Sequence, residues 1–436
     1  MIFKRKLYDK LLVWKQQTAG TKALLIEGAR RIGKSTLVEE FAKNEYRSYL
    51  MIDFNKVSDS VISAFNNYMN DLDTFFLILS SEYGVRLYPK ESIIIFDEIQ
   101  QFPKARQAIK YLVADGRFDY IETGSLISIK ENVNDITIPS EERTLLMYPM
   151  DFEEFAWAMN EEPLMAYIRQ CFDKKVPLEQ GIHAKAMLLF RQYMIVGGMP
   201  KSLSAYLENN RNFEMADMEK RDILTLYRND IKKIKSGYRS SVLSIFDQIP
   251  AFLSRSERRV VMNRIEKGAS FPKYHDTFFW LSDSMIANEC FNCSDPNVGL
   301  SLNEDRTYVK CYMGDTGLLI SHTFDENEIS DGELYREILL GKLSVNEGMF
   351  YENVIAQMLV AAGHKLYFYT RYNQEKHRND MEIDFILSNH SKLRYKIFPI
   401  EVKSNDKYSI RSLTRFNESF RQRIGGSYVI HPKNLS

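Results

Sequence analysis

The chain has 436 residues, with 58 Lys and Arg against 58 Asp and Glu, and 44% of its residues are hydrophobic. This length predicts about three domains, and the composition is that of a globular protein with enough apolar residues for a sizeable core. The balanced charge excludes a global electrostatic field that would draw the whole chain to nucleic acid or to a membrane, so any such binding must be local.

Apolar runs in the sequence are all shorter than the roughly 20 residues that a membrane-spanning helix needs. The first residues lead from Lys4-Arg5-Lys6 into mixed amphipathic sequence rather than into a secretory signal. We therefore expect a cytoplasmic protein with no membrane partner. The four cysteines fit reduced thiols in that compartment, and Cys290-x-x-Cys293 lacks the second ligand pair that would complete a zinc site.

A strand-like apolar run at residues 23–26 precedes a glycine-rich segment in which Gly28, Gly33, Lys34 and Ser35 have the spacing of a phosphate-binding loop. In such a loop the backbone N–H groups and the positive end of the next helix face one anion. We expect Lys34 to reach the β- and γ-phosphates of ATP and Ser35 to bind Mg²⁺. The predicted loop residues are Gly28, Ala29, Arg30, Arg31, Ile32, Gly33, Lys34, Ser35 and Thr36.

The second half of the nucleotide site is predicted at residues 92–98, where an apolar run typical of a buried parallel strand ends in two carboxylates. Asp97 is expected to hold Mg²⁺ through water, and Glu98 to polarise the water that attacks the γ-phosphate. The alternative is an ordinary core strand followed by acidic surface residues. A further strand ends in Thr123-Gly124-Ser125, so that Thr123 or Ser125 is a candidate sensor of the γ-phosphate.

With these motifs the chain resembles the AAA+ class of ATPases. More narrowly, it resembles a large prokaryotic family in which such an ATPase is joined to a C-terminal domain of unknown function. The resemblance implies a nucleotide site between subunits of a homo-oligomer, completed by an arginine of the neighbour, for which Arg143 and Arg228 are candidates. The resemblance to this family also rests on the Arg30-Arg31 variant of the phosphate loop and on residues 148–155, 197–200 and 312–318.

The order of the predicted elements indicates an α/β multidomain protein. We expect a parallel-sheet ATPase core at residues 1–155, a helical lid at 156–239, a winged-helix domain at 240–328 and a last domain at 329–436. Residues 272–288 are the candidate recognition helix, and a basic cluster nearby could meet phosphates or be a solvated face. Winged helices bind DNA or dock proteins, and the sequence leaves both open. The basic cluster is Arg255, Arg258, Arg259 and Arg264.

A second group of candidate catalytic residues lies in the last hundred residues. Period-2 alternation sends Asp384 to the polar face of one strand, and Glu401 and Lys403 to the polar face of the next. Glu352, on a preceding helix, could turn toward them. This order resembles the restriction-endonuclease-like PD-(D/E)XK nucleases, and the resemblance implies that Asp384, Glu401 and Glu352 bind Mg²⁺ while Lys403 orients the attacking water. The alternative is a cross-strand ion pair.

Three hypotheses follow from these patterns. In the first, ATP drives a motor or switch that acts on DNA or RNA through the nuclease-like domain. In the second, the protein is a regulatory or signalling ATPase whose C-terminal domain is a non-catalytic binding module. In the third, cleavage belongs to defence against phage or mobile DNA and is triggered only in an assembly.

Overall fold

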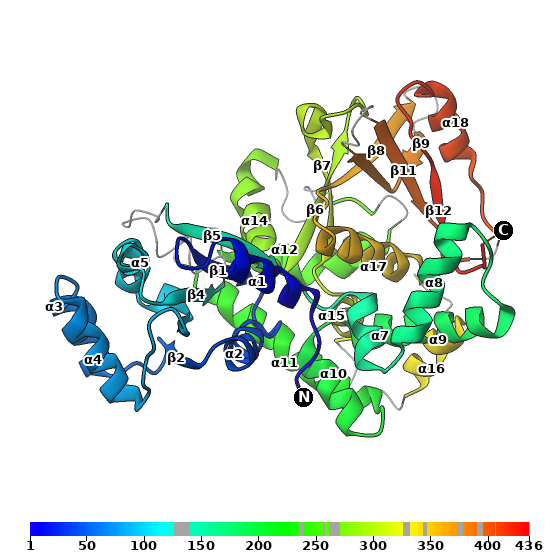
Figure 1. The fold of residues 1–436 in the computed structure, drawn as a ribbon. Helices are drawn as coiled ribbons and strands as arrows, with labels where there is room; N and C mark the ends of the chain where they lie inside the picture. Colours follow the sequence, from blue (N-terminus) through cyan, green and yellow to red (C-terminus); the bar gives the residue numbers. More distant parts are fainter. Residues whose placement is uncertain are drawn as a thin grey trace. The chain divides into compact units, whose positions relative to one another are not determined.

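The computed structural model describes residues 1–125, 140–234, 239–255, 258–260, 271–325, 332–342, 347–373, 378–389, 396–405 and 407–435. The chain divides into two compact units, Met1–Tyr148 and Pro149–Ser436 (Figure 1). In the described ranges, no helix combines the length and the apolar character that crossing a membrane requires.

The first unit is built on a parallel sheet of five strands in the order β2-β3-β4-β1-β5 (Figure 1). Every residue of β1 and of β3 is buried, which explains why both strands read as continuous apolar runs. The predicted parallel-sheet P-loop fold is therefore confirmed. The strands are β1 (Ala23–Gly28), β2 (Ser48–Asp53), β3 (Ser92–Asp97), β4 (Asp119–Gly124) and β5 (Glu142–Met147).

Helices cover both faces of this sheet. One face carries an apolar core in which Phe65, Phe75 and Phe96 lie among the aromatic side chains. The other face is covered by α2, whose Val38 and Phe41 are buried. The helices of this unit are α1 (Lys6–Gln17), α2 (Lys34–Glu45), α3 (Asp59–Asn67), α4 (Leu72–Tyr83) and α5 (Pro103–Asp115), with a 3₁₀ turn η1 (Ile99–Gln101).

The second unit begins with helices, as the periodicity of residues 156–239 predicts. The role of these helices as a lid over the nucleotide stays a prediction. They are α7 (Phe152–Ala158), α8 (Glu162–Lys174), α9 (Gln180–Val196), α10 (Pro200–Glu208), α11 (Phe213–Lys232) and α12 (Arg239–Leu253). The later helices are α14 (Phe271–Asp283), α15 (Thr316–Thr323), α16 (Glu333–Leu340), α17 (Glu347–Ala361) and α18 (Arg411–Ser419).

Two glycine-containing turns of the second unit pack backbone against backbone. A Cβ on Gly198 would lie 2.2 Å from the carbonyl oxygen of Met150, and a Cβ on Gly317 would lie 2.6 Å from the Cα of Gly197. Asp315 joins the turns, because its carboxylate accepts the Gly198 amide at 2.6 Å. This packing explains two motifs to which the sequence alone assigned no mechanism.

The strands of the second unit form a sheet in the order β7-β6-β8-β9 and another in the order β10-β11-β12. The antiparallel pair β6–β7 is part of the larger sheet, because β6 also pairs with β8 in parallel. The winged-helix assignment therefore stays a prediction. The strands are β6 (Ala287–Cys293), β7 (Glu304–Met313), β8 (Leu366–Asn373), β9 (Arg378–Ile383), β10 (Phe385–Asn389), β11 (Lys396–Val402) and β12 (Tyr428–Ile430), and a 3₁₀ turn η2 (Leu300–Asn303) precedes β7.

Two local expectations were wrong. The expected single strand around Asp384 is broken there into β9 and β10, and the Asp384 carboxylate accepts the backbone amide of Val402. The candidate recognition helix ends at Asp283 rather than near residue 288, and its Phe279 is 51% exposed. Between residues 332 and 342 lies α16, which buries Tyr335 and Ile338.

Candidate functional site

The phosphate loop connects β1 to α2, which begins at Lys34. Gly33 has a φ of 91°, a conformation that residues with a Cβ rarely adopt. Gly28 is required for another reason, because its φ is not positive. An added Cβ at this position would lie 2.4 Å from the carbonyl oxygen of Met147. The close approach of β5 is therefore the reason for glycine at position 28.

Lys34 lies across this loop and is only 6% exposed. Its ammonium donates to the carbonyl oxygens of Gly28 at 3.0 Å and Ala29 at 2.9 Å. Burial lowers the pKa of Lys34 to about 8, although the nearby carboxylates of Glu98 and Asp97 favour its charged form. A buried cation whose desolvation is only partly offset is well suited to bind an anion such as a phosphate group.

The carboxyl ends of β3 and β4 and the start of α2 meet at Asp97. Its Oδ1 accepts a hydrogen bond from Ser35 Oγ at 2.7 Å, and the hydroxyl of Thr123 donates to the same oxygen. The Thr123 oxygen also accepts the backbone amide of Glu98 at 3.3 Å. β4 lies between β1 and β3 in the sheet, which places Thr123 between the two predicted nucleotide motifs.

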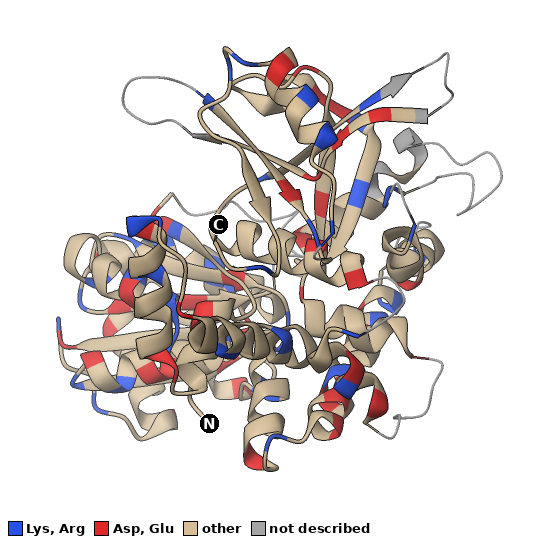
Figure 2. Ribbon diagram, turned by 90° about the vertical axis from the view of Figure 1, so that its right-hand side faces the viewer, with Lys and Arg blue, Asp and Glu red and all other residues tan. Residues whose placement is uncertain are grey.

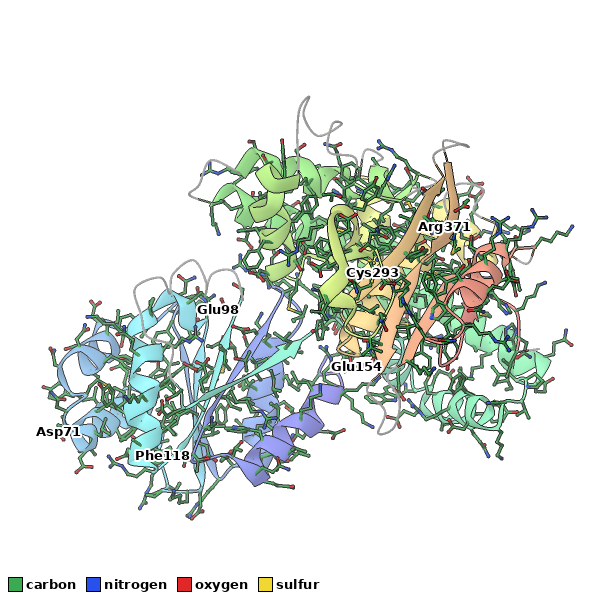
Figure 3. All side chains as sticks on the ribbon, turned by 90° about the horizontal axis from the view of Figure 1, so that it is seen from above. Asp71, Glu98, Phe118, Glu154, Cys293 and Arg371 are labelled. Carbon is green, nitrogen blue, oxygen red and sulfur yellow. The ribbon has the colours of Figure 1, made fainter. Side chains whose placement is uncertain are left out.

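Glu98 follows β3 at the edge of the sheet opposite Phe118, which precedes β4 (Figure 3). Its φ of 56° is uncommon for a residue with a Cβ and marks a local constraint. Gln100 donates from Nε2 to Glu98 Oε2 at 2.5 Å, which fixes the carboxylate. Sequence reasoning missed Gln100, because a glutamine two residues after the carboxylates has no signature of its own.

The other predicted loop residues differ in exposure. Ala29 and Ile32 are buried, whereas Arg30, Arg31 and Thr36 are exposed or partly exposed. Ser125 is half-buried just after β4 and next to residues 126–139, which lie outside the described residues.

Arg5 is a further residue that sequence reasoning missed at the phosphate loop. Its guanidinium donates to the carbonyl oxygens of Ile32 at 2.9 Å and Tyr148 at 2.6 Å. It therefore ties the loop to the end of the first unit.

The oxygen ligands at the phosphate loop fit Mg²⁺. Ser35 Oγ and Asp97 Oδ1 are hard donors only 2.7 Å apart, at the start of a helix that also presents Lys34. Ser35 and Asp97 would hold the ion, which would supply positive charge to the phosphate oxygens of a nucleotide. The site therefore suits a magnesium–nucleotide complex.

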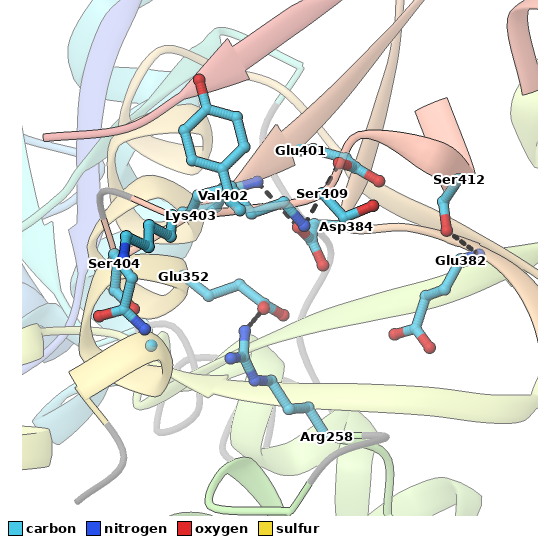
Figure 4. Close-up of a pocket in the computed structure, with 14 residues that line it drawn as sticks. Arg258, Glu352, Glu382, Asp384, Glu401, Val402, Lys403, Ser404, Ser409 and Ser412 are labelled. Atoms are coloured by element: carbon cyan, nitrogen blue, oxygen red, sulfur yellow. Dashed lines mark hydrogen bonds and ion pairs between the residues drawn. The ribbon is translucent and has the colours of Figure 1, made fainter. Parts of the chain in front are cut away.

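A cavity of about 420 Å³ in the second unit brings together the other predicted residues (Figure 4). Glu352 reaches it from α17, Asp384 from the break between β9 and β10, and Glu401 and Lys403 from the end of β11. Glu382 and Arg258 also line the cavity. Most of the remaining lining residues lie between the end of β11 and the start of α18. These remaining residues are Gly348, Val402, Ser404, Asn405, Lys407, Tyr408, Ser409 and Ser412.

Each carboxylate in this cavity has a partner from the protein itself. Asp384 Oδ2 accepts the amide of Val402 at 2.8 Å, and Lys403 Nζ lies 3.3 Å from Glu401 Oε2. Burial raises the pKa of Glu401, and the charge of Lys403 opposes that shift. Lys403 thus pairs with its own strand neighbour.

Two cations from elements earlier in the chain also contact the acidic side chains. Lys310 on β7 is fully buried, with Nζ 3.0 Å from Glu382 Oε1 and 3.2 Å from Glu352 Oε1. Arg258 forms an ion pair with the other oxygen of Glu352. Sequence reasoning missed Lys310 and treated Arg258 only as part of a basic patch, because nothing local links either residue to the distant carboxylates.

The contacts of Lys310 and Arg258 affect whether the cavity can bind the Mg²⁺ ion that the nuclease resemblance implies. A divalent ion needs several carboxylate oxygens that converge on one point. Within the described ranges, no group of three or more His, Cys, Asp or Glu side chains is placed to hold a metal ion. The residues present in the cavity therefore do not fit a divalent ion in this arrangement.

Other predicted candidates lie elsewhere. Arg228 pairs with Asp247 at 3.1 Å and with Asp325 at 2.7 Å, so its charge is already paired within the second unit, whereas Arg143 is exposed on β5. Arg259 lies over the ring of Tyr308. Arg264 lies outside the described residues. Figure 2 shows Lys and Arg interspersed with Asp and Glu along the ribbon.

Among the residues that the structure describes, the cysteines form no metal site. Cys290 and Cys293 lie on β6, and both are buried. Burial raises the pKa of each thiol, so both favour the protonated state rather than the thiolate that zinc requires. The remaining thiols, Cys171 and Cys311, are also free and buried.

Comparison with known families assigns the first unit. Residues 20–156 match the family model of an AAA domain. Residues 187–328 match a domain of unknown function (DUF8612), and residues 347–436 match another domain of unknown function (DUF4143). The first unit is thus similar to AAA domains, and the names of the other two matched families state no activity. No curated protein matches the chain.

Solved structures give only remote likenesses. Orc1 of Aeropyrum pernix in complex with DNA is 9% identical over 75% of this chain and 93% of that chain, with a TM-score of 0.27. The RuvB branch migration motor of Thermotoga maritima is 12% identical over 67% and 90%, with a TM-score of 0.28. A signal transduction ATPase of Pyrococcus horikoshii is 12% identical over 82% and 48%, with a TM-score of 0.30. Likenesses at this level establish nothing about the function of this chain.

Proposed function

We propose that this protein binds and hydrolyses ATP in its first unit and that its second unit is a regulated binding module rather than a magnesium-dependent nuclease. The observation that supports ATP hydrolysis is the arrangement around Asp97. Ser35 of the phosphate loop and Thr123 of β4 both donate to this carboxylate, and Thr123 also contacts the amide of Glu98. A phosphate-binding cation, Lys34, lies beside them.

Each residue has a distinct role in the proposed reaction. Lys34 and the amides of the phosphate loop bind the β- and γ-phosphates, and Ser35 and Asp97 hold Mg²⁺, which supplies positive charge to the phosphate oxygens. Glu98, oriented by Gln100, accepts a proton from the water whose oxygen attacks the γ-phosphorus as the bond to the ADP oxygen breaks. Release of phosphate from ATP, measured with and without Mg²⁺, tests this function.

The second unit has two candidate roles, and one observation favours each. Convergence of Asp384, Glu401 and Lys403 on one cavity supports the nuclease resemblance. The contacts of Lys310 and Arg258 with the neighbouring carboxylates support the binding module, because the acidic charge is already satisfied. We favour the second role. An assay of Mg²⁺- or Mn²⁺-dependent cleavage of single- and double-stranded DNA and RNA, with and without ATP, decides between them.

The partners follow as further proposals. DNA or RNA remains a candidate partner of the second unit, and binding of labelled oligonucleotides in the same samples tests it. The AAA-domain match supports a homo-oligomer in which a neighbour's arginine completes the ATP site. Arg143 on β5 is the better placed of the two candidates, since the charge of Arg228 is already paired. Light scattering with and without ATP tests oligomerisation.

A further inference from the structure

The ammonium group of Lys310 lies among carboxylates of the cavity in the second unit. Besides its contacts with Glu382 and Glu352, its Nζ lies 3.9 Å from Asp384 Oδ1. Lys310 and Glu352 are both fully buried, so water screens this charge cluster little. The three carboxylates come from α17, from β9 and from the break after β9, whereas the lysine comes from β7.

A second cation and a hydroxyl complete the surroundings of Glu352. Arg258 pairs with its Oε2, and the hydroxyl of Tyr312 donates to its Oε1. Tyr312 lies two residues beyond Lys310 on β7, which places both side chains on the same face of that strand. β7 and Arg258 together therefore supply three donors to a carboxylate that the nuclease resemblance makes a metal ligand.

An ammonium group beside these oxygens disfavours a divalent cation at the same place. A magnesium or manganese ion needs carboxylate oxygens at about 2.0–2.6 Å, and a buried positive charge about 3 to 4 Å from the same oxygens would repel it strongly. Moving Lys310 away would leave its charge unpaired in the protein interior, which is unfavourable. The lysine is thus held beside Glu352 and Asp384, two of the three carboxylates that the resemblance makes metal ligands.

We infer that Lys310 is a tethered cation that excludes divalent metal ions from the cavity, so that the carboxylates link β7 to α17 and β9 instead of forming a metal centre. This inference rests on the proposed role of the second unit as a binding module. It also crosses the boundary between the two matched families, because Lys310 belongs to the segment at 187–328 and the carboxylates belong to the segment at 347–436.

The test is Mn²⁺ binding by the full chain without nucleotide, followed by electron paramagnetic resonance. Four proteins are compared: the wild type, Asp384→Asn, Lys310→Met and the double variant Lys310→Met with Asp384→Asn. Lys365→Met is the matched control, because Lys365 precedes β8 of the same sheet and pairs with Glu304 at the surface. Wild type and Asp384→Asn should bind the same amount of Mn²⁺. Lys310→Met should gain one ion per chain, and the double variant should lose it.

Two results would overturn the inference. One is Mn²⁺ binding by the wild type that Asp384→Asn removes, a result that does not depend on the lysine variant folding. The other is a folded Lys310→Met protein, judged by circular dichroism, that gains no ion. If Lys310→Met is unstable, Lys310→Gln is used, and Mn²⁺ should raise the unfolding temperature of the variant but not that of the wild type; the absence of such a rise counts against the inference.

These outcomes separate this inference from the proposed function. Asp384-dependent cleavage of DNA or RNA by the wild type with Mg²⁺ would refute the binding-module role itself. No cleavage by the wild type, together with no gain of Mn²⁺ in folded Lys310 variants, would refute only the role assigned to Lys310.

Discussion

The carboxylate of Asp315 accepts the backbone amide of Gly198 at 2.6 Å, joining two turns that are more than a hundred residues apart in the sequence. The first turn also binds the start of the second unit, because the Met150 amide donates a hydrogen bond to the Gly198 carbonyl oxygen at 2.8 Å. Gln357 of α17 donates to Asp315 from the other side at 3.1 Å. The start of the second unit is therefore fixed to the same buried network as its last domain.

Replacing Gly198 with Ala should destabilise the second unit. An added Cβ would lie 2.2 Å from the Met150 carbonyl oxygen, and its three nearest atoms would all be backbone atoms of Met150, which leaves little room for adjustment. We expect a loss of about 1–3 kcal/mol in the free energy of unfolding, which is typical of an overpacked interior. Urea denaturation measures it. Gly426→Ala is the control, because its nearest neighbour would be 3.6 Å away, and an equal loss there would contradict the explanation.

Lys34→Met should abolish ATP binding, because it removes the buried cation of the phosphate loop. Charge-assisted hydrogen bonds contribute about 1.5–3 kcal/mol each, so loss of two phosphate contacts should weaken affinity by at least about 100-fold. Calorimetry measures the dissociation constant. Lys43→Met on the same helix is the control, since Lys43 is exposed and pairs with Glu39 at 2.8 Å. Unchanged affinity in Lys34→Met would mean that the phosphates bind elsewhere.

Glu98→Gln should still bind ATP but lose hydrolysis. The amide keeps the size of the side chain but cannot accept a proton from water, and loss of a general base lowers kcat by about 10²–10⁴-fold. Steady-state phosphate release and calorimetry separate the two effects. Glu91→Gln, an exposed neighbour that pairs with Arg47, should behave as the wild type. Hydrolysis at the wild-type rate by Glu98→Gln would move the base to another residue.

Glu122 predicts how the stability of the first unit depends on pH. This carboxyl group is fully buried on β4, and burial first, then the charge of Glu142, raises its pKa well above 4.5. The folded state therefore keeps a proton that the unfolded chain loses above about pH 4.5. Stability should consequently fall as the pH rises from that value toward the folded pKa, by up to about 1.4 kcal/mol per pH unit from this group.

Glu122→Gln tests this sign, since glutamine cannot ionise. The variant should be more stable than the wild type at about pH 8, and the difference should shrink as the pH approaches about 4.5. Hydrogen exchange of β4 amides at several pH values reports on the first unit alone. Glu91→Gln again provides the exposed control. A wild type whose β4 protection is the same at about pH 5 and about pH 8 would show that Glu122 ionises normally.

The sequence by itself determined the local parts of the nucleotide site. The spacing of Gly28, Gly33, Lys34 and Ser35 specifies a loop, and the apolar run before Asp97 and Glu98 specifies a buried strand with carboxylates at its end. Both depend on neighbours within a few residues, through backbone conformation and the period of side chains along a strand. Alternation along each strand likewise predicts polar faces for Asp384 and Glu401, but Asp384 lies at the break between β9 and β10 and Glu401 is buried.

Only the tertiary structure decided which groups surround those residues. Thr123 reaches Asp97 because β4 lies between β1 and β3, and Gly28 must be glycine because β5 passes close to it. Lys310 reaches Glu352 from 42 residues earlier in the chain, through the pairing of β7 with the sheet that holds β9. Local sequence patterns do not specify how close two residues so far apart in the chain will lie, because chain topology and packing determine that distance. For that reason Glu352 and Asp384, which resemble metal ligands in the sequence, lie beside a buried lysine in the fold.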